Sequence, residues 1–179
     1  WEEGDEVVLQ ASRSKTSDIA SAGLDADNLE ETQGQLYEWR INLISGAVTE
    51  RTLSAVRCDF TRVNDSYACQ KTRYIYGAVF NPVRPFSFDG VMKFDNKTQT
   101  STKFDYGPNR FGGEAVFAPK VGAMTEDDGY LICFIQDEEV GQSECLILDA
   151  KNIVAGPVAS ILVPYRVPYG FHAGWVATG

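Results

Sequence analysis

The sequence contains one histidine, His172, and imidazole is the side chain most often found as a metal ligand. It lies in residues 166–175, where proline and glycine stand among aromatic residues, so the backbone there is loop-like. Apolar neighbours would desolvate the imidazole, and the neutral form binds metals. The alternative is a core histidine bonded to a backbone carbonyl. One ligand cannot hold a catalytic metal alone, so His172 needs partners.

Two carboxylates could serve as such partners. Glu114 follows a Gly-Gly pair and precedes Ala-Val-Phe, which indicates a close approach of two backbones and a buried carboxylate. Either it forms a salt bridge with an arginine such as Arg110, or it accepts a hydrogen bond from a metal-bound histidine and so orients the ring. Asp59, within residues 57–64, presents the same choice. The spacing of these residues leaves both alternatives open.

Other kinds of site find little support in the sequence. The acidic runs at residues 1–6, 126–128 and 137–139 could suggest calcium, but the last two lie at predicted turns and lack the alternating oxygen ligands of an EF-hand. We interpret them as solvated turns. The sequence has no GxSxG motif, phosphate loop, GxGxxG motif or nucleophilic Cys-His pair, which argues against common hydrolases, nucleotide-binding proteins and dehydrogenases.

The elements that position these residues are predicted to be strands, because apolar and polar residues alternate with period two. Residues 36–43 and 48–53 form a predicted hairpin, and residues 91–94 form a second with a return through Phe104. Residues 17–29 are predicted to be a surface loop with one short turn. Further strands are predicted at residues 6–10, 73–80, 114–117, 130–136, 145–149 and 158–163.

The predicted fold class is therefore all-β. The last four strands would form one antiparallel meander of about fifty residues, which is the size of a propeller blade. With 179 residues, 44% of them hydrophobic, the chain suits a single domain, either a small sandwich or part of a larger ring.

Charge and cysteine content exclude several partners and frameworks. The formal net charge is −9 and no basic cluster occurs, so nucleic acid is not an expected partner. Apolar runs are far too short for a membrane-spanning helix. The four cysteines match no metal motif or dense disulfide framework and are predicted to be reduced, buried thiols.

Several segments together resemble the carotenoid cleavage dioxygenases, a family of non-haem iron enzymes. The combination of Leu-Tyr-Glu, Gly-Pro-x-Arg-Phe-Gly, Glu-Ala-Val-Phe and Val-Pro-Tyr-Gly-Phe-His is most similar to the plant-type branch that cleaves at the 9,10 and 9′,10′ double bonds. The resembling segments lie at residues 1–9, 36–40, 59–64, 73–77, 107–117, 126–131 and 166–172.

This resemblance implies that residues 1–179 are a single partial domain, the C-terminal blades of a seven-bladed β-propeller with Fe(II) held on its axis by four histidines. His172 matches the last iron ligand. Glu114 and Asp59 match two carboxylates that steady the ligands, with Asp59 standing where many members have glutamate. The family's Phe-Pro-Arg is Phe60-Thr61-Arg62 here, which loses the fixed φ of proline.

The implied reaction is cleavage of a carotenoid or apocarotenoid double bond by dioxygen to aldehyde or ketone products. Selectivity would come from the shape of an apolar tunnel, for which Phe171, Tyr169 and Phe117 are candidate lining residues, with core packing as the alternative. The chain is expected to begin just after the third histidine and to be inactive alone. The N-terminal blades, and any patch that touches a membrane peripherally, would lie upstream.

Two alternatives stay open. Within the family, the chain could come from an epoxycarotenoid-cleaving or stilbene-cleaving enzyme. Outside it, a propeller that has lost its other histidines could serve as a non-catalytic binding module, and upstream histidines would distinguish the two. The expected location is the cytoplasm, with the plastid as the alternative.

Overall fold

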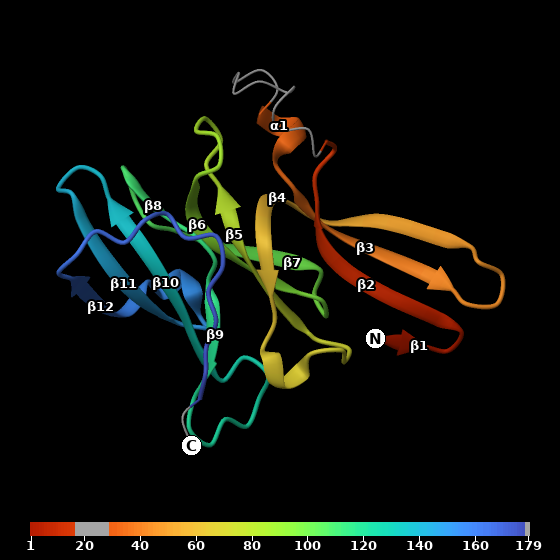
Figure 1. The fold of residues 1–179 in the computed structure, drawn as a ribbon. Helices are drawn as coiled ribbons and strands as arrows, with labels where there is room; N and C mark the ends of the chain where they lie inside the picture. The colour runs from red at the N-terminus through yellow and green to blue at the C-terminus, as the bar shows by residue number, and fades with distance from the viewer. Residues whose placement is uncertain (17–28, 178–179) are drawn as a thin grey trace.

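The protein is described here from a computed structural model that covers residues 1–16 and 29–177 (Figure 1). The described chain is almost entirely β-structure, which confirms the predicted fold class. Its elements are β1 (Glu2–Glu3), β2 (Glu6–Arg13), α1 (Leu29–Thr32), β3 (Gln35–Asn42), β4 (Val48–Arg62), η2 (Asp65–Tyr67), β5 (Tyr74–Phe80), β6 (Phe88–Asp95), β7 (Thr100–Asp105), β8 (Arg110–Gly112), β9 (Val116–Pro119), β10 (Gly129–Asp137), β11 (Gln142–Asp149), η3 (Ile153–Ala155) and β12 (Pro157–Val163).

The strands form one continuous antiparallel arrangement. Pairing follows chain order from β1 to β6 and continues through β8, β10, β11 and β12, while β7 pairs with β6 and β9 pairs with β10. The long strand β4 joins two parts of the sheet, because its first part pairs with β3 and its end, from Cys58 to Arg62, pairs with β5. Figure 1 shows the β2–β3–β4 hairpins extending to one side of β5 and the β10–β11–β12 meander lying on the other.

Both predicted hairpins and the predicted C-terminal meander are confirmed. The sequence pattern does not predict β1, β8 or the second half of β4. β8 has only three residues, too few to show an alternation, and the second half of β4 begins in small residues at Ser54 and Ala55. The predicted loop at residues 17–29 lies outside the described residues except for Leu29, which begins α1.

The central strands β5 and β6 are buried on both faces. Tyr76 and Val91 pack into one hydrophobic cluster with side chains of β9, β10 and β11. Ile75 and Met92, which point to the opposite face, pack into a second cluster with residues of β3 and β4. Successive residues of a strand point to opposite faces, so two separate cores form around one pair of strands.

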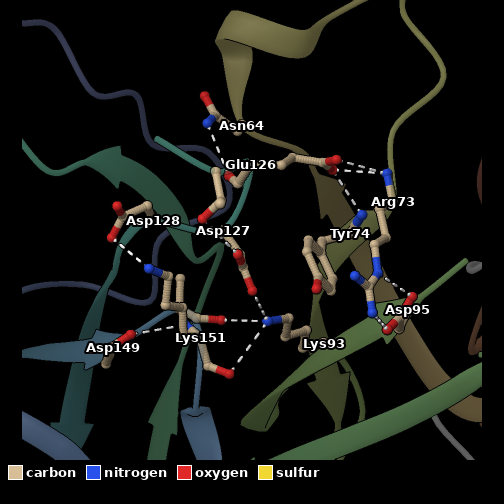
Figure 2. Close-up of polar contacts among 12 residues, drawn as sticks. Asn64, Arg73, Tyr74, Lys93, Asp95, Glu126, Asp127, Asp128, Asp149 and Lys151 are labelled. Carbon is tan, nitrogen blue, oxygen red and sulfur yellow. Dashed lines mark hydrogen bonds and ion pairs between the residues drawn. The ribbon is translucent and has the colours of Figure 1, made fainter. Parts of the chain in front are cut away.

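An acidic loop before β10 ties these layers together (Figure 2). The Glu126 carboxylate accepts hydrogen bonds from the backbone N–H groups of Arg73, at 2.9 Å, and Tyr74, at 2.7 Å. Asp127 Oδ2 accepts a 2.8 Å hydrogen bond from the buried ammonium group of Lys93, which also donates to Ala150 O at 2.8 Å. The interpretation of residues 126–128 as a solvated turn is therefore wrong, because partners distant in sequence bury Asp127 and occupy the Glu126 carboxylate.

The cysteines are free thiols, as expected, but they are not all buried. Cys58 and Cys133 are buried, Cys145 is partly buried and Cys69 is exposed. In residues 1–16 and 29–177, no helix is long and apolar enough to cross a membrane.

Candidate functional site

His172 lies in a terminal segment without regular secondary structure. β12 ends at Val163, and residues 164–177, which contain Pro164 and Pro168, form no strand or helix. Proline has no N–H to give to a strand ladder, so the sheet cannot continue through this stretch. The segment, blue in Figure 1, returns from β12 toward the start of β9. Side-chain and backbone contacts must therefore position the imidazole.

A close approach of two backbones brings Glu114 to this segment. A Cβ atom on Gly113 would lie 2.1 Å from the carbonyl oxygen of Gly170, so the contact requires glycine at position 113. Gly113 precedes Glu114 directly, and Gly170 stands two residues before His172. The contact thus sets the carboxylate beside the histidine, and it matches the close approach that the Gly-Gly pair predicts.

The Glu114 carboxylate is buried and contacts both sides of the site. Its Oε2 accepts a 2.6 Å hydrogen bond from Ala173 N and lies 3.6 Å from His172 Nδ1. Its Oε1 lies 3.5 Å from Nη1 of Arg62. The sequence leaves open a salt bridge or a contact with the histidine, and the structure places Glu114 beside both. The arginine is Arg62, because Arg110 pairs with residues of β10 and β11 instead.

The imidazole of His172 is accessible. Its side chain is 77% exposed, and one side of the ring packs on Phe60 with ring centres 4.9 Å apart. Within residues 1–16 and 29–177, Phe60 is the aromatic residue packed on the ring, and the rest of the imidazole is open. With Nδ1 facing Glu114, no residue of the described chain bonds to Nε2.

Asp59 lies near this site, and in the part of the chain that the structure describes no ion pair or hydrogen bond joins it to the histidine. Its Oδ1 accepts a 2.8 Å hydrogen bond from the backbone N–H of the next residue, Phe60, whose φ is +49°. This bond stabilises a left-handed backbone conformation that a bulky residue seldom adopts. Asp59 thereby supports the backbone at Phe60, whose ring packs on His172. The structure brings Glu114 and His172 together and places Asp59 one residue from their aromatic neighbour.

An apolar pocket of about 280 Å³ adjoins the Phe60 ring. Five phenylalanines from β4, β5, β6, the loop before β6 and the terminal segment dominate its wall. Asp59, Ser14, Thr16 and Thr32 are the polar residues that line it. The phenylalanines are Phe60, Phe80, Phe86, Phe88 and Phe171.

Of the three candidate lining residues, the structure places only Phe171 at this pocket. Phe117 is 4% exposed and stacks on Tyr76 in the core, at 5.8 Å between ring centres, so core packing accounts for it. Tyr169 packs against Phe111 of β8 and donates a hydrogen bond to Glu138. The other four phenylalanines are missed by sequence reasoning. Phe86 and Phe88 follow Pro82 and Pro85 closely, and this aromatic and proline-rich stretch is the one signal that could have indicated them.

The residues present fit a metal ion as one part of a larger ligand set. An accessible imidazole nitrogen, with the other ring nitrogen beside a buried carboxylate, is the arrangement found around metal-bound histidines. In the part of the chain that the structure describes, no three histidine, cysteine, aspartate or glutamate side chains are grouped as a metal site would need. A metal bound at His172 would require further ligands.

One protein-family model matches nearly the whole chain. The family model described as retinal pigment epithelial membrane protein matches residues 1–177. The chain belongs to this family. The carotenoid 9,10(9′,10′)-cleavage dioxygenase of Crocus sativus is 41% identical to it, over 98% of this chain and 35% of the relative. The apocarotenoid-15,15′-oxygenase of Synechocystis is 31% identical, over 85% of the chain and 31% of the relative.

Solved structures of family members show the same fold. A variant of the Synechocystis apocarotenoid oxygenase aligns with a TM-score of 0.89 at 27% identity, covering 99% of this chain and 38% of that one. The cobalt-substituted form of that enzyme aligns with a TM-score of 0.88 at the same identity and coverage. The predicted family and the predicted propeller blades are both confirmed. The chain spans about a third of the length of the curated relatives it matches.

Proposed function

We propose that the protein containing this chain is a non-haem Fe(II) dioxygenase that cleaves a double bond of a carotenoid or apocarotenoid to aldehyde or ketone products. The observation that carries the proposal is the accessible imidazole of His172, set between the buried Glu114 carboxylate and a phenylalanine-lined pocket. Fe(II), held by His172 and by ligands from outside this chain, would supply the activation of dioxygen.

The residues of this chain would bind and orient the reactants. The phenylalanine wall would hold part of a long apolar polyene and exclude water from the metal's side of the pocket. Glu114 would fix the rotation of the His172 ring through Nδ1 and leave Nε2 for the metal. Phe60, which contacts both the pocket and the imidazole, would set how near the substrate lies to the metal.

The 9,10 and 9′,10′ double bonds are the proposed cleavage positions. Four relatives at 38–41% identity are named for cleavage there, three from pea, Arabidopsis thaliana and bean besides the Crocus enzyme. Cleavage of an epoxycarotenoid is the second candidate, since an Arabidopsis thaliana 9-cis-epoxycarotenoid dioxygenase is 35% identical. The proposed location is the cytoplasm. The plastid is the alternative, because the Arabidopsis thaliana 9-cis-epoxycarotenoid dioxygenase is named chloroplastic.

The test is product analysis with the full-length protein. Wild type and His172→Ala are expressed in carotenoid-producing cells, and products are identified by mass. We expect 9,10-cleavage products from wild type and a loss of about 100-fold or more in His172→Ala, because the metal loses a ligand. Tyr165→Phe is the control, since Tyr165 lies in the same segment and is 78% exposed.

Other results would change the assignment. Products of epoxycarotenoid or stilbene cleavage would identify a different branch. Carotenoid binding without any product would favour the binding module. Full activity of His172→Ala would contradict the proposed role of this residue.

A further inference from the structure

An ion pair between two residues far from His172 in sequence holds the terminal segment in which His172 lies. Arg84, in the loop between β5 and β6, donates two hydrogen bonds to Glu138, in the turn between β10 and β11. Nη1 to Oε2 measures 2.6 Å and Nη2 to Oε1 measures 2.9 Å. Two parallel bonds of this kind fix the relative orientation of both side chains. The Tyr169 hydroxyl donates to the same carboxylate, at Oε1.

Aromatic contacts also hold Tyr169, which is half-buried. The Arg84 guanidinium lies 4.5 Å from the ring centre of Phe111 and 5.7 Å from that of Tyr169. The rings of Phe111 and Tyr169 pack edge to face, with their centres 6.4 Å apart. We call Arg84, Phe111, Glu138 and Tyr169 the tyrosine clamp. The hydrogen bonds from Arg84 and then Tyr169 lower the pKa of Glu138 to about 2, so the carboxylate is charged at neutral pH.

The loop that presents Arg84 is itself ordered. Asn81 Oδ1 accepts a 2.8 Å hydrogen bond from the backbone N–H of Arg84, and Ser87 Oγ donates to its carbonyl oxygen at 2.9 Å. The same loop carries Phe86, which lines the apolar pocket. The clamp therefore rests on fixed backbone on the β5–β6 side, next to the pocket wall.

His172 lies between two fixed points. The tyrosine clamp holds Tyr169 on one side, and Glu114 holds the backbone N–H of Ala173 on the other. Between them, Gly170 packs directly against Gly113. The stretch from Tyr169 to Ala173 has no strand partner, so these contacts, together with the packing of Phe171 and His172 on Phe60, set where the imidazole stands.

We propose that Arg84 and Glu138 are positioning residues that act through Tyr169 to hold His172 in the orientation that binds the metal. This inference rests on the proposed function, in which His172 is a ligand. A histidine on a loosely held segment would spend less time in the binding orientation, and the apparent metal affinity would fall in proportion. Tyr169 was a candidate for the substrate wall, and its contacts give it this role instead.

The test compares Tyr169→Phe, Arg84→Gln, Arg84→Lys and Glu138→Gln in the full-length protein. Hydrogen exchange of the amides in residues 164–177 is measured on metal-free protein, and cobalt affinity is measured by competition with a chelator. We expect about tenfold faster exchange and about tenfold weaker cobalt binding in Tyr169→Phe, Arg84→Gln and Glu138→Gln, because each change removes or weakens a hydrogen bond to a charged group. Arg84→Lys should lie between these variants and wild type, since lysine keeps the charge but not the paired geometry.

Arg73→Gln is the matched control. Arg73 also forms a two-bond pair, with Asp95, and its side chain is 43% exposed against 41% for Arg84. It should leave exchange in residues 164–177 and cobalt affinity unchanged. His172→Ala should abolish cobalt binding at this site.

The two readouts separate the inference from the function on which it rests. Unchanged exchange in Tyr169→Phe and Arg84→Gln would overturn the clamp. Faster exchange with wild-type cobalt affinity, while His172→Ala loses cobalt, would overturn the positioning role alone. Full cobalt binding by His172→Ala would overturn the proposed function and the positioning role with it.

Discussion

A buried carboxylate beside one nitrogen of an imidazole determines which way the ring faces. Glu114 is held from two directions, by the Ala173 N–H and by Arg62, so it cannot turn away from His172. Glu114 Oε2 lies 3.6 Å from His172 Nδ1, which places the carboxylate in contact with that ring nitrogen. A metal ligated by His172 would need such a carboxylate to orient the ring.

Replacing Glu114 by glutamine should weaken metal binding without unfolding the protein. Glutamine keeps the shape and one acceptor for Ala173 N, but it removes the charge that favours an Nδ1–H donor. We expect about 10- to 100-fold weaker binding of Fe(II) or cobalt, measured by chelator competition. Glu38→Gln is the control, because Glu38 is equally buried and pairs with Arg51 away from the site. Equal metal affinities for the two variants would count against the role of Glu114.

The thiols should differ sharply in reactivity. Burial raises the pKa of Cys58 and of Cys133 to about 12, so almost no thiolate forms at pH 8. Cys69 is exposed. Brief alkylation of the native protein followed by peptide mass mapping should modify Cys69 and spare the two buried thiols, which should react only after unfolding in urea. Alkylation of Cys58 as fast as Cys69 would show that the β4–β5 core opens readily.

At the scale of elements, local pattern predicts strands well and their partners poorly. The alternation in residues 36–43 and 130–136 identifies β3 and β10, because one face of each is buried. Asp127 looks like a solvated turn residue in sequence, since its partner Lys93 lies 34 positions earlier. Only the folded sheet brings the two together, and no local signal marks such a pair.

The buried Lys93–Asp127 ion pair should contribute far more to the free energy of unfolding than the neighbouring Lys151–Asp128 pair. The two side chains are 9% and 12% exposed, so Asp127→Asn would leave a buried ammonium group without its counter-charge. We expect a loss of about 3–5 kcal/mol in the free energy of unfolding, measured by urea denaturation. Asp128→Asn, the control, removes a pair with the half-exposed Lys151 and should cost about 1 kcal/mol or less. Similar losses in both variants would show that burial does not govern this pair.

At the scale of the whole molecule, the resemblance and the geometry contribute different parts of the account. The family motifs single out His172, Glu114 and Asp59, and the structure brings the first two into contact while Asp59 supports Phe60. The phenylalanine pocket could not be predicted, because its wall is gathered from several elements that only the sheet topology places side by side. Phe117, a candidate lining residue from the sequence, lies in the hydrophobic core instead.

The central claim, that His172 is a ligand of iron, is tested most directly by the metal content of the full-length protein. Wild type, His172→Ala and Tyr165→Phe are purified, loaded with Fe(II) under anaerobic conditions, desalted and analysed by inductively coupled plasma mass spectrometry, with thermal melts to confirm folding. Wild type and Tyr165→Phe should each retain about one iron per protein, and folded His172→Ala about a tenth of that or less. A folded His172→Ala protein that retains iron at the wild-type level would contradict the account.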